Sequence, residues 1–127
     1  MKLASIDVGL KRIGIAICLT SDIVTPQTAI LRKNRNQAAR DVNIFLKEWE
    51  IEKLIVGFPS ASIDMQNRIN HFVSLLELKI PYEFCEENMS SIEAEDLIKG
   101  EIKYKRDGRV DSLAAKIILE RFLAKKP

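Results

Sequence analysis

The stretch that decides the fold spans residues 3–17 and reads LASIDVGLKRIGIAI. Apolar residues before Gly9 and after Arg12 predict two β-strands, over residues 2–8 and 12–19, joined by a tight turn. Asp7 interrupts the first apolar run. Because a carboxylate in a sheet costs several kcal/mol unless it is compensated, its position indicates a cation or a donor-rich ligand close by. The alternative is a turn aspartate that caps nearby backbone amides.

Length and composition predict one globular domain over residues 1–127. The chain has 127 residues, of which 46% are hydrophobic and 30% charged, enough for a real core. No apolar run is long enough to cross a bilayer and no signal peptide precedes the first strand, so we expect a cytoplasmic protein without membrane contact. Cys18 and Cys85 are too few for a zinc cluster and are expected to be reduced core residues.

Beyond the hairpin, the hydrophobic pattern predicts alternating strands and helices. A third strand, at residues 23–31, contains Pro26, which favours an edge position. Two amphipathic helices follow, each leading into a short strand, at residues 53–58 and 81–86. Their apolar stripes comprise Ala38, Val42, Phe45, Leu46 and Trp49 in the first helix and Met65, Ile69, Phe72, Val73 and Leu76 in the second. We therefore interpret Phe45 and Trp49 as core residues, and His71, beside the second stripe, as a surface residue.

Two further helices are expected at the end of the chain. The pattern Ser90-x-x-Glu93 has the form of a capping box and opens a helix that runs to about Gly100. A last amphipathic helix extends from Val110 to Phe122, with Asp111 in its first turn. Asp111 could serve there simply as a cap.

This order of elements predicts an α/β fold, a ribonuclease H-like mixed five-stranded sheet flanked by helices. Sites in such open sheets form outside the carboxyl ends of the parallel strands. Asp7, in the central strand, would then lie close to Glu86 and Glu87, at the end of the strand predicted over residues 81–86. Strand alternation in the sequence alone does not decide which of the two glutamates faces Asp7.

Basic residues gather in three segments, although the net charge is only +2. They are Lys11-Arg12, the run Arg32-Lys33-Asn34-Arg35, and a segment with Lys99, Lys103, Lys105, Arg106 and Arg109 around Tyr104. Such loops could bind a phosphate backbone. The alternative for any single run is a solvated loop kept in solution by its charges.

Four motifs together resemble the YqgF/RuvX family, ribonuclease H-like proteins related to Holliday-junction resolvases. They are DVGLKRIGIA at residues 7–16, IVGFP at 55–59, EENMSSIEAE at 86–95 and VDSLAA at 110–115, and the resemblance extends over nearly the whole chain. It implies a metal-dependent nuclease of the bacterial cytoplasm that matures the 5′ end of pre-16S rRNA. Resolution of branched DNA, the Holliday junction, is the alternative activity.

The resemblance also implies a set of site residues. The family's acidic residues correspond to Asp7, Glu87 and Asp111, which would act as catalytic residues and hold Mg²⁺ or Mn²⁺, the hard cations that carboxylates prefer. Asp107 is a candidate fourth ligand. Substrate contacts are assigned to five basic residues: Lys11, Arg12, Lys105, Arg106 and Arg109.

The chain departs from the family pattern at three places that bear on substrate contact. Asn88 replaces an arginine, Cys18-Leu19 replaces Ser-Asp, and the loop at residues 60–64 lacks glycine. These departures keep open a non-catalytic nucleic-acid-binding module. A third hypothesis treats the Asp7-Val8-Gly9 turn as the phosphate-facing turn of an actin-like or sugar-kinase-like ATPase, for which one domain would supply only half a nucleotide cleft. The expected oligomeric state is a monomer or a homodimer.

Overall fold

The structure, a computed structural model, describes residues 1–20, 23–86 and 109–125, with side chains in the last range described from Ser112 onward. Its elements are β1 (Leu3–Val8), β2 (Arg12–Cys18), β3 (Thr25–Leu31), α1 (Arg35–Glu48), β4 (Lys53–Phe58), α2 (Ile63–Leu76), β5 (Tyr82–Glu86) and α4 (Arg109–Lys125). The helix expected from the Ser90-x-x-Glu93 pattern lies outside the described residues. No helix of the described part is long and apolar enough to span a bilayer.

The described strands form one mixed sheet in the order β3-β2-β1-β4-β5. β1 pairs antiparallel with β2, and β2 antiparallel with β3, whereas β1 and β4, and β4 and β5, pair in parallel. The predicted change from antiparallel to parallel pairing is therefore confirmed. It occurs at β1, which places the strand that carries Asp7 in the middle of the sheet.

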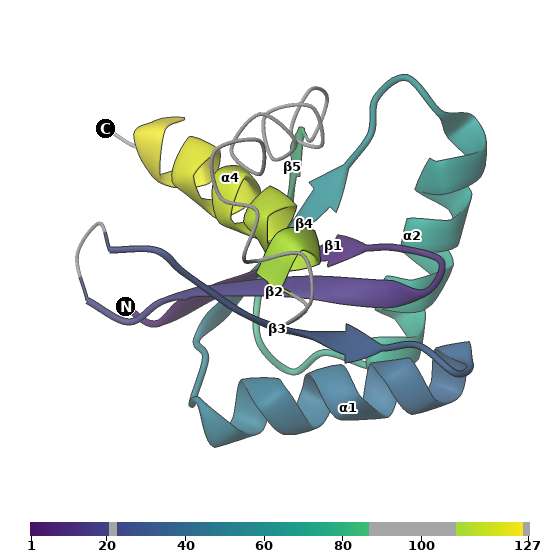
Figure 1. Cartoon of the computed structure of the whole chain (residues 1–127), viewed down its shortest axis with the longest axis horizontal. Helices are drawn as coiled ribbons and strands as arrows, with labels where there is room; N and C mark the ends of the chain where they lie inside the picture. The colour runs from purple at the N-terminus through teal and green to yellow at the C-terminus, as the bar shows by residue number, and fades with distance from the viewer. Residues whose placement is uncertain (21–22, 87–108, 126–127) are drawn as a thin grey trace.

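Helices cover both faces of the sheet (Figure 1). One face packs on α1 and α2 and includes Ala4, Ile6 and Val8 of β1 in its core. The other face packs on α4, and its core includes Leu3. Alternate residues of a strand point to opposite faces, so Leu3, Ser5 and Asp7 belong to the α4 face.

β3 is an edge strand, as Pro26 predicts. Pro26 pairs with Ala16, and the pairing of β2 with β3 shifts register between Ile13 and Ile15. Proline has no amide hydrogen to donate to a ladder, which explains the edge position.

The assignment of Trp49 to the core is wrong, because Trp49 is 37% exposed. Helix α1 ends at Glu48, Trp49 is its C-cap residue, and Glu50 adopts a positive φ of 53° as the chain turns toward β4. The helical stripe therefore stops before Trp49, whose ring lies 5.9 Å from that of the partly buried Phe45. His71 is exposed, as predicted.

Both cysteines are buried in the core and neither forms a disulfide, as the sequence predicts. The Cys85 Sγ atom lies 3.7 Å from the Ile118 carbonyl oxygen. Burial raises the pKa of the Cys85 thiol, so the group stays protonated near neutral pH and behaves as a packing residue.

Candidate active site

Asp7 is the penultimate residue of β1 and lies directly opposite Gly14 of β2. Its side chain is half-buried, whereas the other five residues of the strand are buried. Because Asp7 shares the α4 face with Ser5, its carboxylate belongs to the side of the sheet that α4 covers. Asp7 is thus the acidic residue of the central strand, next to apolar packing and at the carboxyl end.

The carboxyl ends of β1, β4 and β5 meet at one edge of the sheet. Ile6 pairs with Val56, and Val56 pairs with Phe84, so the three parallel strands run level with one another. β5 ends at Glu86, which pairs with Phe58 of β4. With β4 between them, Asp7 and the end of β5 are separated by two strand spacings, roughly 10 Å.

Glu86 is turned away from the face that Asp7 occupies. Its Oε1 atom accepts a hydrogen bond from the Ser60 amide at 3.3 Å. The preceding residue, Cys85, contacts α4, so alternation puts Glu86 on the opposite face. Of the two candidate glutamates, Glu86 does not converge on Asp7, and Glu87 lies outside the described residues.

Two buried serines fasten α4 to the central strands. The Ser112 hydroxyl accepts a hydrogen bond from the Ile15 amide at 3.1 Å, and the Ser5 hydroxyl donates to the Ala115 carbonyl at 2.6 Å. Ile15 follows Gly14, the partner of Asp7, at the point where β2 and β3 shift register. These bonds hold the first turn of α4, which contains Asp111, over the strand pair that carries Asp7.

Neither serine is singled out by sequence reasoning, although both lie within the family motifs or next to them. The sequence feature that marks both residues is a hydroxyl among apolar neighbours: Ser5 lies between Ala4 and Ile6, and Ser112 precedes Leu113. Buried hydroxyls are almost always hydrogen-bonded, so both positions predicted a partner without identifying it.

Replacement of Ser112 by alanine is expected to lower the free energy of unfolding by about 1–3 kcal/mol, because it leaves the buried Ile15 amide without an acceptor. Urea denaturation followed by circular dichroism measures the change. The matched control is Ser74→Ala, which removes an exposed hydroxyl from α2 and should shift stability by less than about 0.5 kcal/mol. Equal losses in the two variants would contradict the fastening role of Ser112.

The turn between β1 and β2 presents two of the predicted substrate-binding residues. Lys11 and Arg12 are exposed, and the Gly9 amide donates to the Arg12 carbonyl at 3.0 Å to close the turn. A Cβ at Gly9 would lie 2.6 Å from that carbonyl oxygen, so the turn requires glycine. Arg109 is the first residue of α4, its side chain is outside the described set, and Lys105 and Arg106 lie outside the described residues altogether.

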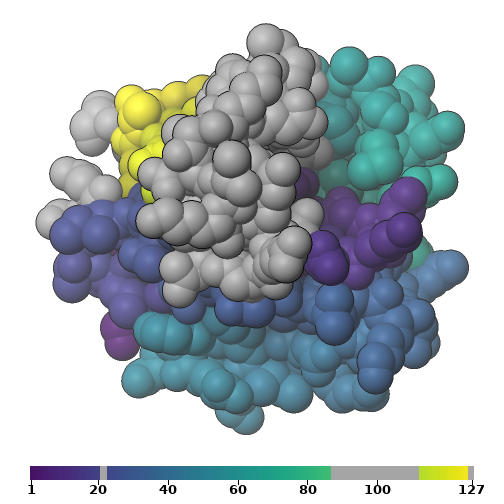
Figure 2. Space-filling model, in the orientation of Figure 1, coloured from purple at the N-terminus to yellow at the C-terminus, as the bar shows by residue number. Residues whose placement is uncertain are grey.

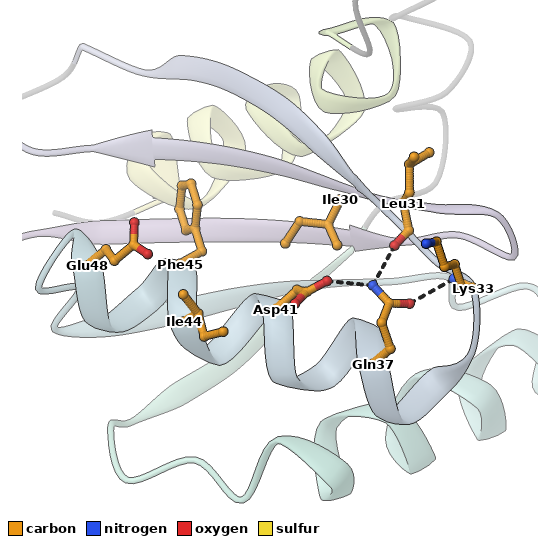
Figure 3. A pocket seen from close by; sticks show the side chains of 8 residues that line it. All are labelled: Ile30, Leu31, Lys33, Gln37, Asp41, Ile44, Phe45 and Glu48. Carbon is orange, nitrogen blue, oxygen red and sulfur yellow. Dashed lines mark hydrogen bonds between the residues drawn. The ribbon is translucent and has the colours of Figure 1, made fainter.

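The side chains of the described residues contain no group of three or more His, Cys, Asp or Glu residues suited to a metal. Glu87, Asp107 and the Asp111 carboxylate lie outside these described side chains. A hollow of about 510 Å³ between β3 and α1 is lined by residues that include Ile30, Gln37 and Phe45 (Figure 3). None of the predicted site residues lines it, so this hollow is separate from the Asp7 site.

Solved structures with this arrangement of elements include a viral resolvase. The crystal structure of the fowlpox virus Holliday junction resolvase superposes with a TM-score of 0.60 over 99% of this chain and 100% of that chain, at 15% identity. At this identity the likeness concerns the fold, and it confirms the predicted ribonuclease H-like architecture.

Sequence comparison extends over the whole chain. A protein from Sulfurovum sp. (strain NBC37-1), named "Putative pre-16S rRNA nuclease", is 64% identical, covering 98% of this chain and 99% of the relative. A protein of the same name from Sulfurimonas denitrificans is 50% identical, covering 99% of each. The family model described as "RuvX: Holliday junction resolvase" matches residues 1–125. The family model and these relatives agree with the mixed sheet and with Asp7 in its central strand. The chain therefore belongs to the RuvX family.

Proposed function

We propose that this protein is an endonuclease that cleaves phosphodiester bonds in pre-16S rRNA and so processes its 5′ end during ribosome maturation. The observation that carries the proposal is the half-buried Asp7 carboxylate in the central strand, beside the helix turn that contains Asp111. The relatives named as pre-16S rRNA nucleases, up to 64% identical, support the choice of RNA. Processing of ribosomal RNA would place the protein in the cytoplasm.

The acidic residues fit a divalent cation, Mg²⁺ or Mn²⁺. Asp7 and the Asp111 position both belong to the side of the sheet that α4 covers, and the Ser112 bond holds α4 there. Carboxylates that converge repel each other by about 4 kcal/mol at 4 Å and an effective dielectric of 20, so such a group favours a bound cation. When bound, the metal supplies an activated water and charge stabilisation for the displaced oxygen.

Glu87 is the third proposed ligand. Its neighbour Glu86 donates no oxygen to this face, because the Glu86 carboxylate accepts from Ser60 on the opposite side. The family correspondence described above also assigns this role to Glu87. Asp7, Glu87 and Asp111 would together hold the metal and orient the scissile phosphate.

Basic residues next to this edge would hold the flanking phosphates. Lys11 and Arg12 are exposed on the turn that follows Asp7 by a few residues, and exposed cations at such a turn can contact a phosphate backbone directly. Lys105, Arg106 and Arg109 are proposed for the same role.

Cleavage should depend on the cation. We expect a labelled pre-16S rRNA fragment to be cut in Mg²⁺ or Mn²⁺ and to stay intact in excess chelator, since the carboxylates alone activate no water. Gel electrophoresis of the products measures this, and restoration of cleavage on adding metal back is the control. RNA binding without products in either metal would contradict the nuclease and favour a non-catalytic binding module.

Branched DNA is the second candidate substrate. The family model is described as a Holliday junction resolvase, and the fowlpox virus resolvase shares the fold. A four-way DNA junction run in the same assay distinguishes the two candidates. Cleavage of the junction and not of the RNA would replace the first proposal with the second.

A further inference from the structure

A basic hollow lies at the same end of the molecule as the Asp7 site but on the other side of the sheet. It has a volume of about 650 Å³, and its lining includes Leu10, Arg32, Lys33, Arg35 and His71. The described residues that line it include no aspartate or glutamate. Arg32, Lys33 and Arg35 belong to the basic run that leads from β3 into the first residue of α1, which the proposed catalytic site does not use.

Arg32 is held in place by three contacts. Its guanidinium donates to the Gly9 carbonyl at 2.8 Å and lies 5.7 Å from the centroid of the Phe72 ring, and its amide donates to the Lys11 carbonyl at 2.9 Å. This residue therefore joins the β1–β2 turn to α2. In Figure 2 the purple surface of that turn adjoins the blue surface around the start of α1.

Positive charge is concentrated there and forms no ion pair with a described carboxylate. Burial, and then the charges of Arg35 and Arg68, lower the pKa of Arg32 from its usual value. Within the described side chains, none of the ion pairs involves Arg32, Lys33, Arg35 or Arg68. Arg35 donates to the His71 Nε2 atom at 3.0 Å, which orients its guanidinium at the rim.

The hollow does not depend on free amides at the start of α1. The Asn34 side chain accepts from the Gln37 amide at 2.7 Å and completes a capping box. Affinity for an anion would come from the guanidinium and ammonium groups. Arginine forks of this kind suit phosphate oxygens, which accept two parallel hydrogen bonds.

We propose that this hollow binds a backbone phosphate of the nucleic acid at a distance from the scissile bond. This proposal rests on the proposed function, and it gives the nucleic acid a path over the surface. The strand runs from Asp7 on the α4 face, passes over Lys11 and Arg12 at the turn, and reaches Arg32, Lys33 and Arg35 on the α1–α2 face. The hollow would therefore contribute to affinity and leave the chemical step unchanged.

The test compares two double variants of equal charge. Lys33→Gln with Arg35→Gln removes two exposed cations from the hollow, and Lys47→Gln with Lys79→Gln removes two exposed cations elsewhere. Fluorescence anisotropy with labelled pre-16S rRNA, in chelator and over a range of salt, gives Kd and its salt dependence. We expect the Lys33→Gln/Arg35→Gln variant to bind the RNA about tenfold more weakly than wild-type protein. The slope of log Kd against log salt concentration should be smaller in magnitude by about 1.5.

Cleavage kinetics separate this inference from the proposed function. With Mg²⁺ present, the Lys33→Gln/Arg35→Gln variant should have a higher KM and a kcat within about twofold of wild type. The reason is that a phosphate contact far from the scissile bond stabilises the bound substrate and the transition state equally. Equal Kd and salt slope in the two double variants, or wild-type protein that does not bind the RNA, would overturn the inference. If wild-type protein binds but does not cleave, the nuclease proposal fails and the binding comparison still decides the hollow.

Discussion

Replacement of Asp7 by asparagine is expected to lower kcat for RNA cleavage by about 10³-fold, which corresponds to ~4 kcal/mol of transition-state stabilisation. Asp7 is the acidic residue of the central strand, half-buried on the α4 face. Asparagine keeps the size of the side chain but removes the negative charge that would hold the cation. Single-turnover cleavage in saturating Mg²⁺ measures the loss.

The fold of this variant should be unaffected. We expect its Tm to stay within about 4 °C of the wild-type value, a difference of less than about 1 kcal/mol. Asp64→Asn, the same chemical change at an exposed residue in the first turn of α2, is the matched control and should keep full activity. Retention of cleavage in Asp7→Asn would remove Asp7 from the catalytic site.

The second large effect distinguishes two neighbouring glutamates. Glu87→Gln is expected to lower kcat by about 10²-fold through loss of a metal ligand, whereas Glu86→Gln should leave kcat within about twofold. The difference follows from Glu86, whose carboxylate accepts from the Ser60 amide on the opposite face of the sheet. Parallel kcat measurements and a Mn²⁺ titration of each variant test it.

The pair is informative because the two substitutions are chemically identical and adjacent. A loss confined to Glu86→Gln would exchange the two assignments. Equal losses would mean that the end of β5 matters as a segment, and would contradict a specific role for Glu87.

The order of elements and the edge position of β3 could be predicted from the sequence because each depends on local patterns. Helical spacing locates α1 and α2, and Pro26 excludes a central position for its strand. The end of α1 could not be located in this way. Periodicity continues through Trp49, but the helix ends at Glu48 and leaves Trp49 at the surface.

The candidate site could be predicted from the sequence only where a single residue differed in character from its neighbours. A charge inside an apolar strand singled out Asp7, and it lies in the central strand. The choice between Glu86 and Glu87 needed the register of β5. Side chains alternate between the two faces of a strand, but the sequence does not say which face any one residue occupies until a neighbour has been placed. The Ser112–Ile15 bond joins residues 97 apart in the sequence and has no local pattern.

That bond and its companion from Ser5 to Ala115, 110 residues apart, also determine when the site can assemble. During synthesis at about 5–20 residues per second, roughly 5 to 20 s pass between Ile15 and Ser112. Until α4 has been made, the α4 face of β1 lacks its cover and Asp7 lacks the helix turn beside it. The proposed site is therefore incomplete in any nascent chain that does not yet include α4.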